Sequence, residues 1–468
     1  MKYLEKTIYT ILYSFLIFFL CSSCKDRYDY PIPPNSFEEA ELPPPSKVTL
    51  SEESGYWQLY RDGEPYYIRG VAASAPTYQS DWLDYYYGML ADYGGNTIRT
   101  YAVDETTRKV LDAAYVHGVA VCVGLWVNKE SQGFDYTNVT AVQQQLYNLR
   151  QQVRQLKDHP ALLMWIVGNE PDAQYESLNH KEQMWKAVND ICAMIKEEDG
   201  LHPTTTAIIN ASQEKLGHIM QWAPNIDILS SNAKENNIAP AIANIKAGGW
   251  TKPFILSEYG PRSIVSLNNV PGRVLEWGAL VEQTSSEKEE DYRKIYQDYI
   301  APNKENNCIG SFAFLWGYLT RAQDQVMTWY GLHTPDGHTF GGVDALQYCW
   351  TGQYPSNRAP VIASRADMLL NGKRAEDNIK IAPGSNNQAK VTASDPDGDP
   401  LEYEWLISEE GAQGPDGGPH PGISGLIQTN GNSEVTFTAP SPGAYRLYVY
   451  VKDNNNKVAN AVIPFLVE

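Results

Sequence analysis

Short apolar runs alternate with amphipathic segments through the middle of the chain. Eight such runs lie at residues 67–74, 96–101, 120–127, 162–170, 204–210, 227–233, 253–260 and 310–316. A strand of a parallel sheet is covered on both faces, so it reads as a nearly continuous apolar run and not as strict alternation. The pattern therefore predicts eight buried parallel strands.

The segments between the runs carry helical spacing. In residues 142–159 the apolar positions recur every three or four residues, at Val142, Leu146, Leu149, Val153 and Leu156. Gly118 and Pro160 stand where two of these helices are expected to end. Eight strands that alternate with helices predict a (β/α)8 barrel, which we assign to residues 51–352. A doubly wound open sheet is the alternative, but it favours fewer strands and a glycine-rich phosphate turn, which we do not find.

The pattern changes after the last predicted helix, over residues 341–352. Residues 353–358 are typical of a linker, and residues 359–468 contain short runs with period-two alternation separated by turn residues. We expect a small all-β sandwich of immunoglobulin-like type. The stretch "DPDGDPLEYEW" resembles cadherin-like and PKD-type modules. Its Asp395, Asp397 and Asp399 suit either a calcium site or a turn, and the turn is favoured.

The N-terminus has the features of a targeting segment. A lysine-bearing start precedes an apolar run over residues 8–20 that is too short for an ordinary membrane span, which predicts a signal peptide. "LCSSC" resembles a bacterial lipobox, which implies cleavage after residue 23 and lipidation of Cys24 at the outer membrane or cell surface. An uncleaved anchor or a plain secretory signal are alternatives. Residues 24–50 are acidic and proline-rich, as in an extended tether.

The net charge and the cysteines limit the kinds of molecule that this chain is expected to bind. The chain has 37 Lys and Arg residues against 56 Asp and Glu, for a net charge of −19. That balance argues against nucleic acid, because neutralising phosphates requires a basic face. The remaining cysteines of the mature chain are too scattered for a metal site or a disulfide framework, so we predict neither. We also expect no cofactor and a monomer.

Candidate chemistry gathers where the predicted strands end, because the carboxyl ends of the strands form the active-site rim of such a barrel. Glu170 ends the fourth strand in "GNEP", and Glu258 ends the seventh in "LSEYG". Strands four and seven lie nearly opposite each other in an eight-membered ring. Two facing carboxyl groups are what glycoside cleavage requires. A single glutamate at a strand end is usually a surface acid, but this pair is harder to explain that way.

Other strand ends supply residues that suit sugar binding. They are Arg99, Trp126, Asn169, Asn232, Tyr259 and Trp316. A structural ion pair is the alternative for Arg99, and core packing is the alternative for the two tryptophans.

These motifs resemble those of clan A retaining glycoside hydrolases. "KDHPALLMWIVGNEPD" is similar to a segment of the family 2 barrel, and "GNTIRTYAVDETTRKVLDAAYVHGV" resembles the barrel of β-1,3-glucanosyltransferases. The resemblance implies that Glu170 is the acid/base and Glu258 the nucleophile. It also implies that Asn169 bonds the sugar 2-hydroxyl, that Arg99 pairs with Glu258, and that Trp316 forms the floor of the sugar subsite.

One position departs from the clan pattern. Members often carry Tyr or His near the end of strand six to bond the nucleophile, whereas this chain has Asn232 followed by Lys234, so Tyr259 or Tyr101 would make that contact. We expect the two carboxyl groups to lie about 5–5.5 Å apart, the retaining geometry. The expected function is hydrolysis of a β-linked polysaccharide or oligosaccharide, with β-1,3-glucan suggested by the second resemblance. A β-glucan transglycosylase and an inactive surface glycan-binding lipoprotein are the alternatives.

Overall fold

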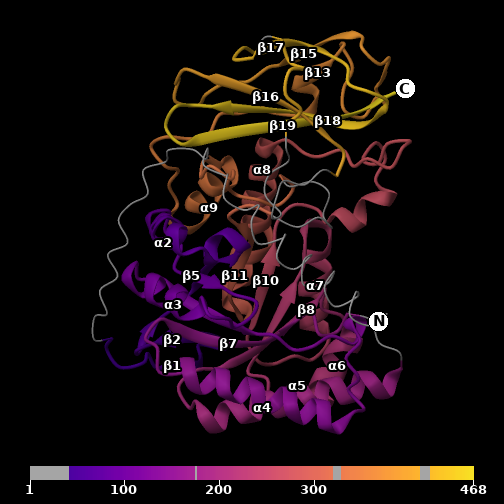
Figure 1. Ribbon diagram of the computed structural model, residues 1–468. Helices are drawn as coiled ribbons and strands as arrows, with labels where there is room; N and C mark the ends of the chain where they lie inside the picture. The colour runs from indigo at the N-terminus through magenta and orange to yellow at the C-terminus, as the bar shows by residue number, and fades with distance from the viewer. Residues whose placement is uncertain (1–41, 174–176, 320–327, 412–421, 429) are drawn as a thin grey trace, which may run out of the picture. The chain divides into compact units, whose positions relative to one another are not determined.

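A computed structural model describes residues 42–173, 177–319, 328–411, 422–428 and 430–468. The predicted signal peptide and Cys24 lie outside these residues. Eight parallel strands close into a barrel in the order β10-β11-β4-β5-β6-β7-β8-β9 (Figure 1), which confirms the predicted fold class. In chain order they are β4 Ile68–Ala73, β5 Thr97–Arg99, β6 Ala120–Leu125, β7 Leu162–Asn169, β8 Thr204–Ile209, β9 Ile228–Asn232, β10 Phe254–Tyr259 and β11 Cys308–Trp316.

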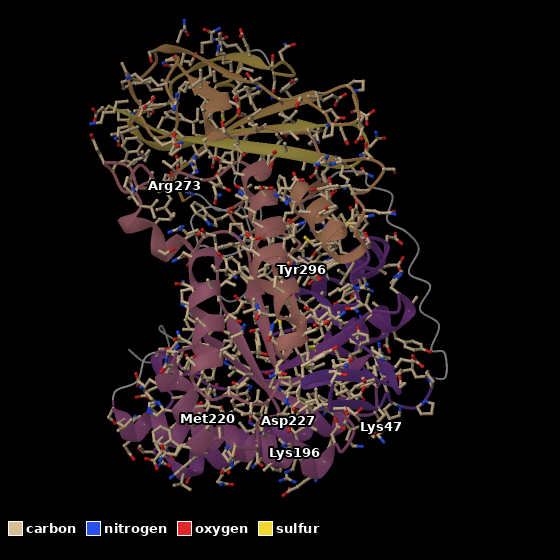
Figure 2. All side chains as sticks on the ribbon, turned by 180° about the vertical axis from the view of Figure 1, so that it is seen from behind. Lys47, Lys196, Met220, Asp227, Arg273 and Tyr296 are labelled. Atoms are coloured by element: carbon tan, nitrogen blue, oxygen red, sulfur yellow. The ribbon has the colours of Figure 1, made fainter. Side chains whose placement is uncertain are left out.

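Helices surround the barrel. They are α2 Leu83–Asp92, α3 Thr107–Val116, α4 Val139–Leu156, α5 Leu178–Glu198, α6 Gln213–Trp222, α7 Glu235–Ala247, α8 Ser285–Ile295 and α9 Gly341–Thr351. The predicted apolar face of α4 packs inward through Leu149, Val153 and Leu156. Asn138 caps this helix by accepting a hydrogen bond from the Ala141 N–H. In the view from behind (Figure 2), Lys196 of α5 lies near Asp227, which just precedes β9. Lys196 Nζ is 2.7 Å from Asp227 Oδ1, so the two residues form an ion pair.

The barrel strands bury both of their faces. Val121 and Trp165 belong to the large cluster that the strands share with the helices. Their neighbours Cys122 and Met164 belong to a separate cluster of strand residues that fills the barrel. Because both faces are covered, these strands are apolar at consecutive positions, which is the pattern seen in the sequence.

A small antiparallel sheet precedes the barrel and was not predicted. It consists of β1 Val48–Glu53, β2 Tyr56–Arg61 and β3 Glu64–Pro65. The Ser46 hydroxyl donates to the Leu162 carbonyl at 2.9 Å, which ties the segment to the start of β7. Residues 46–50 are therefore part of the fold, and the tether expected up to residue 50 is too long.

The C-terminal part is all β. One of its sheets contains β13 Met368–Leu370, β15 Asn386–Val391 and β17 Glu434–Thr438. The other contains β14 Lys380–Ile381, β16 Glu402–Glu409, β18 Gly443–Lys452 and β19 Lys457–Val467. Trp405, Phe437 and Leu447 lie in the core of this domain. The Asp395 carboxylate accepts hydrogen bonds from the backbone N–H groups of Asp397 and Asp399, which is a turn arrangement.

The barrel and the β domain are packed against each other. Strand β12 Thr339–Phe340, which leads into α9, pairs with β19 and so joins the larger sheet (Figure 1). The buried Lys457 ammonium contacts the Asp344 carboxylate of α9 and the Tyr93 hydroxyl. The backbone N–H of Asn460 donates to the Ser285 hydroxyl at 2.9 Å. Residues 353–358 are therefore a short connection between two parts in direct contact.

Two further features bear on the predictions made above. Cys122, Cys192, Cys308 and Cys349 are free thiols, the first three of them buried. Among the residues that the structure describes, no helix combines the length and the apolar character needed to cross a membrane.

Candidate active site

Glu170 is held at an abrupt turn at the end of β7. Gly168 and Glu170 both have positive φ, 79° and 53°, a region that glycine tolerates and that strains most other residues. The backbone N–H of Glu170 donates to the Ala207 carbonyl of β8 at 2.7 Å. The neighbouring strand therefore fixes the backbone that carries the carboxyl group, and the strained conformation is concentrated at a residue expected to be functional.

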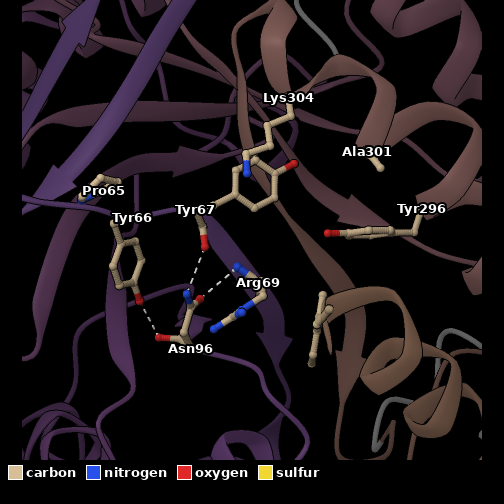
Figure 3. A pocket seen from close by; sticks show the side chains of 9 residues that line it. Pro65, Tyr66, Tyr67, Arg69, Asn96, Tyr296, Ala301 and Lys304 are labelled. Carbon is tan, nitrogen blue, oxygen red and sulfur yellow. Dashed lines mark hydrogen bonds between the residues drawn. The ribbon is translucent and has the colours of Figure 1, made fainter. Parts of the chain in front are cut away.

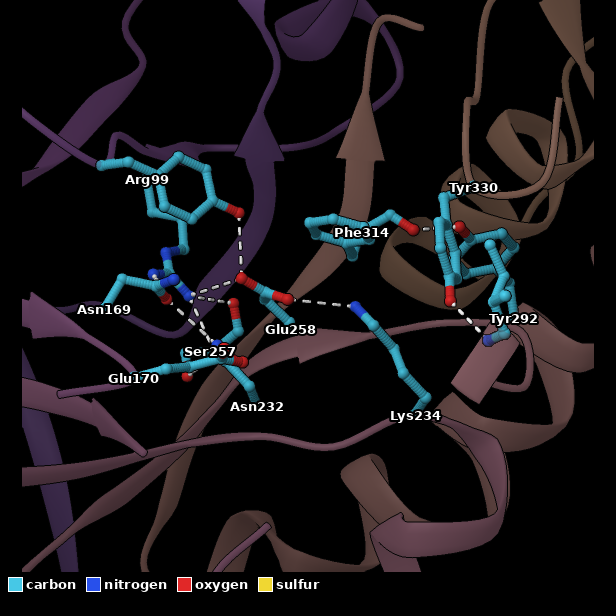
Figure 4. A network of polar contacts seen from close by, with 12 residues as sticks. Arg99, Asn169, Glu170, Asn232, Lys234, Ser257, Glu258, Tyr292, Phe314 and Tyr330 are labelled. Atoms are coloured by element: carbon cyan, nitrogen blue, oxygen red, sulfur yellow. Dashed lines mark hydrogen bonds and ion pairs between the residues drawn. The ribbon is translucent and has the colours of Figure 1, made fainter. Parts of the chain in front are cut away.

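Glu258 ends β10 among three hydrogen-bond donors and cations (Figure 4). The Tyr101 hydroxyl donates to Oε1 at 3.0 Å, and Arg99 Nη1 lies 3.6 Å from the same oxygen. Lys234 Nζ lies 3.2 Å from Oε2. The Glu258 side chain is only 9% exposed, so these interactions are weakly screened by solvent. Two cations and a hydroxyl stabilise it as an oriented carboxylate.

A buried network joins the two glutamates. Arg99, which is 0% exposed, donates to Asn169 Oδ1 at 2.9 Å and to Asn232 Oδ1 at 3.1 Å. Asn232 Nδ2 in turn donates to Glu170 Oε1 at 3.0 Å. The side chains of four different strands are thus locked together, as catalytic constellations require.

Glu170 lies in an environment that favours the protonated carboxyl. Burial, followed by the negative charge of Glu258, raises the pKa of Glu170 above its ordinary value, while the hydrogen bond from Asn232 opposes the shift. Glu258, by contrast, is flanked by Arg99 and Lys234. Two carboxyl groups in such different surroundings are suited to the roles of proton donor and anion.

Sequence reasoning missed Lys234 as a functional residue. Its side chain is only 13% exposed, and this partial burial lowers the pKa of its ammonium group to about 8 in spite of the opposing effect of Glu258. Its Nζ lies 3.4 Å from the centroid of the Phe314 ring and 5.4 Å from that of Tyr330. The only sequence signal was a lysine two residues beyond the end of a strand, and many such lysines are simply solvated.

Two aromatic residues do not lie where they were expected. Trp316 is 0% exposed, and its indole N–H donates to the Tyr86 carbonyl at 3.0 Å. Tyr259 is also 0% exposed and packs edge-on against Tyr292 of α8. Neither side chain can reach a sugar from these positions. Phe314 and Tyr101 lie beside Glu258 instead.

Irregular strand ends explain this correction. The pairing of β11 with β4 shifts register between Ala313 and Trp316, and the pairing of β10 with β11 shifts between Leu256 and Tyr259. Such a shift changes the face to which the following side chains point. Trp126, expected at the rim, is half-buried beyond β6, with Lys129 Nζ 5.4 Å from its ring centroid.

The comparison with known families agrees with this geometry. Residues 78–340 match the TIM barrel domain of glycosyl hydrolases family 2, which is more than half of the chain. The chain belongs to this family. Among the residues that the structure describes, no group of three or more His, Cys, Asp and Glu side chains is placed to hold a metal ion.

Relatives of this family 2 chain include β-glucuronidases. The protein from Chlorocebus aethiops is 24% identical over 234 residues, and the human protein is 25% identical over 236 residues. Each alignment covers 46% of this chain and 34% of the relative, so the chain spans about a third of the length of these relatives. The solved structure of Bacteroides uniformis β-glucuronidase 2 bound to cyclophellitol-6-carboxylate aziridine has a TM-score of 0.48 and 16% identity, covering 90% of this chain and 48% of that one.

Proposed function

We propose that this family 2 protein is a retaining β-glycoside hydrolase. The observation that supports the proposal is the pairing of Glu170 and Glu258 through one buried network, with Glu170 in surroundings that favour its proton and Glu258 between two cations. A structural pair of acids would not need this asymmetry, whereas retaining cleavage requires one acid and one carboxylate.

The steps follow from the geometry. In the first step Glu258 attacks the anomeric carbon while Glu170 gives its proton to the glycosidic oxygen, so the leaving sugar departs as an alcohol. A glycosyl ester on Glu258 remains. In the second step Glu170, now a carboxylate, takes a proton from water, and the resulting hydroxide displaces Glu258. The carboxyl separation of about 5–5.5 Å stays a prediction of this mechanism.

The neighbouring residues have supporting roles in the proposal. Asn169 bonds the sugar 2-hydroxyl, and Arg99 orients Asn169 while it stabilises Glu258. Asn232 holds Glu170, and Tyr101 orients Glu258. Partly exposed aromatic side chains such as Trp126 are suited to stacking on the apolar face of a sugar ring.

The substrate we favour is a β-linked glucan, with β-1,3 linkage suggested by the resemblance of residues 95–119 to glucanosyltransferase barrels. A β-glucuronide is the second candidate. The site contains two cations, Arg99 and Lys234, and one carboxylate, Glu258, when Glu170 holds its proton. Its net charge is then positive, which favours the binding of an acidic sugar. The relatives named β-glucuronidases agree with that option.

The test is product release by the native protein and by Glu258→Gln and Glu170→Gln. The panel contains β-1,3- and β-1,4-glucans, galactans, mannans and aryl β-glucosides and β-glucuronides. We expect one class to be cut with retention of the anomeric configuration. A 2-fluoro glycoside of that class should release its aglycone and leave the 2-fluoroglycosyl group as an ester on Glu258, which mass spectrometry detects. Glycan binding without cleavage across the panel would favour the inactive binding protein. Products longer than the substrate would favour transglycosylation.

We further propose a lipid anchor, a cellular location, a role for the C-terminal domain and an oligomeric state. The lipobox-like "LCSSC" supports lipidation of Cys24 and a location at the outer membrane or cell surface, which mass spectrometry of the membrane fraction would test. The two sheets, antiparallel except where β12 and β14 pair with β19, support an immunoglobulin-like C-terminal domain from about residue 359 that acts as a spacer or contacts glycan. A monomer is proposed, and its mass in solution is the check.

A further inference from the structure

A cavity of about 520 Å³ lies away from the glutamates (Figure 3). Tyr67 immediately precedes β4 and Asn96 immediately precedes β5, and Lys304 lies in the short 3-10 helix Ala301–Asn306 that leads into β11. The cavity is therefore at the amino-terminal ends of the strands, whereas Glu170 and Glu258 stand at the carboxyl-terminal ends. It cannot be a subsite of the proposed active site.

The cavity has a positive lining in an acidic protein. Arg69 and Lys304 line it, and none of the nine lining residues is acidic, although acidic residues outnumber basic ones 56 to 37 in the chain. Among the described residues neither cation has an ion-pair partner. Figure 3 shows the Lys304 side chain extending toward the Tyr67 ring. Two cations that line a concave surface and have no ion-pair partner among the described residues favour the binding of an anionic ligand.

Two of the lining residues also carry a buried N–H group without a hydrogen-bond partner among the described residues. Arg69 Nε and the indole Nε1 of Trp350 are both buried without a hydrogen bond in the part of the chain that the structure describes. A buried N–H group without an acceptor costs free energy, so a native structure normally satisfies it with protein, water or ligand.

Aromatic rings form much of the remaining wall. Tyr66, Tyr67, Tyr296 and Trp350 line the cavity, and Lys304 Nζ lies 5.1 Å from the centroid of the Tyr67 ring. The Asn96 side chain donates to the Tyr67 carbonyl at 2.9 Å and accepts from the Arg69 N–H at 2.9 Å, which fixes the segment that carries both residues. The wall is thus preorganised, and its size is in the range of small-ligand sites.

From these observations we propose that the cavity binds an anionic saccharide of one or two sugar units. Arg69 and Lys304 bind its carboxylate or sulfate group, and the aromatic wall packs against its ring. This site is separate from the proposed active site, at the other end of the same barrel, and it binds an acidic sugar or the acidic end of a glycan chain. The proposal does not depend on the hydrolase activity, because none of its residues belongs to the glutamate network.

The test uses a readout at the cavity itself. Glu258→Gln protein labelled with 5-fluorotryptophan is titrated with glucuronic acid, and the ¹⁹F signal of Trp350, assigned with Trp350→Phe, is followed. We expect a saturable shift that glucose at the same concentrations does not produce. Lys304→Gln, at an exposed position, should weaken binding by about tenfold, as expected for loss of a charge-assisted contact. Arg69→Gln should weaken it at least as much.

The matched control is Lys246→Gln, an exposed lysine on α7, which should leave the titration unchanged. In the protein with native Glu258, Lys304→Gln should also leave the rate of substrate cleavage unchanged. Equal binding of glucose, or unchanged binding in Lys304→Gln, would overturn the proposal. Inorganic phosphate that binds as tightly as glucuronic acid would also overturn it, because the cavity would then be a site for bare anions.

Discussion

Individual side chains around Glu258 set the charge of the candidate site. Removal from water destabilises the ammonium form of Lys234, whereas Glu258, 3.2 Å away, and the face of the Phe314 ring stabilise it. Burial is the larger effect, so the pKa of Lys234 falls to about 8. If Glu258 is the nucleophile proposed above, activity should depend on pH through the charge of Lys234.

We predict that Lys234→Met lowers kcat by about 10- to 100-fold, because it removes a preorganised cation beside Glu258, the proposed nucleophile. In the native protein, kcat/KM should fall as Glu170 loses its proton and should fall more steeply above about pH 8, where Lys234 becomes neutral. The variant should lack the second decline. The check is a pH–rate profile with Lys246→Met as the control, and an identical alkaline limb in Lys234→Met would contradict the prediction.

At the scale of elements, the barrel strands place the site through close backbone contacts. Gly124 of β6 lies against the segment that follows β5, and a Cβ built at this glycine would be 2.4 Å from the Thr100 carbonyl oxygen and 2.7 Å from Tyr101 Cα. Both contacts are with backbone, which cannot rotate out of the way. The absence of a side chain at residue 124 therefore decides where Tyr101 presents its hydroxyl to Glu258.

Gly124→Ala is accordingly predicted to lower the free energy of unfolding by about 1–3 kcal/mol through overpacking. It should also lower kcat/KM, because Tyr101 is displaced from Glu258. The control is Gly217→Ala in α6, where nothing lies within 4 Å of the added Cβ. That change should be neutral or stabilising by up to about 1 kcal/mol. Urea unfolding and steady-state rates measure both effects, and a fully active, stable Gly124→Ala protein would refute the explanation.

At the scale of the whole molecule, the barrel and the β domain share buried polar contacts. Lys457 of β19 is 4% exposed and Asp344 of α9 is 1% exposed, so neither charge has water as an alternative partner. Asp344 also accepts a hydrogen bond from the Ala359 N–H at 2.7 Å, at the start of the β domain. Such an arrangement couples the stability of the two parts, and we expect them to unfold in a single transition.

Lys457→Met is predicted to destabilise the protein by about 3–5 kcal/mol, since it leaves the Asp344 carboxylate buried without its cation. Adding Asp344→Asn should restore part of the loss, because the amide oxygen still accepts from Ala359 without carrying a charge. The exposed pair Arg108–Asp112 offers a comparison, where Arg108→Ala should cost less than about 1 kcal/mol. Differential scanning calorimetry distinguishes these cases, and a double variant less stable than Lys457→Met would count against this account.

A second prediction at this scale concerns acid. His333 is buried beneath Trp316 and Tyr86, and burial lowers its pKa to about 3. The unfolded chain takes up this proton near pH 6.5, so between pH 6.5 and 3 the unfolded state binds more protons than the folded one. The free energy of unfolding should therefore fall by about 1.4 kcal/mol per pH unit on acidification through this range.

The comparison that isolates His333 is its replacement by Gln, which can still accept a hydrogen bond from the Gly317 N–H as Nδ1 of His333 does. Other groups contribute equally to both proteins, so only the difference between their pH dependences matters. Urea titrations at several pH values should give a shallower acid slope for His333→Gln. Parallel slopes would mean that His333 titrates normally in the folded protein.

The amino-acid sequence by itself determined the eight strands, the change to an all-β domain, and the two glutamates at strand ends. These features are local or periodic: a strand buried on both faces must be apolar at consecutive positions, and a barrel places strand ends on one rim. The family 2 resemblance was also visible there. The extra sheet β1–β3 was not predicted. Its first residues fell in the expected tether and the rest in the segment assigned to the barrel, because such short, partly exposed strands lack a periodic apolar pattern.

Only the tertiary structure decided which neighbours surround those glutamates. Lys234 reaches Glu258 because β9 and β10 are adjacent in the barrel, and no spacing in the sequence states where a flexible lysine will point. Trp316 and Tyr259 turned away from the rim because register shifts near the strand ends reversed their faces. Irregularities of this kind arise from the closure of the whole barrel, so they cannot be read from the pattern of any one strand.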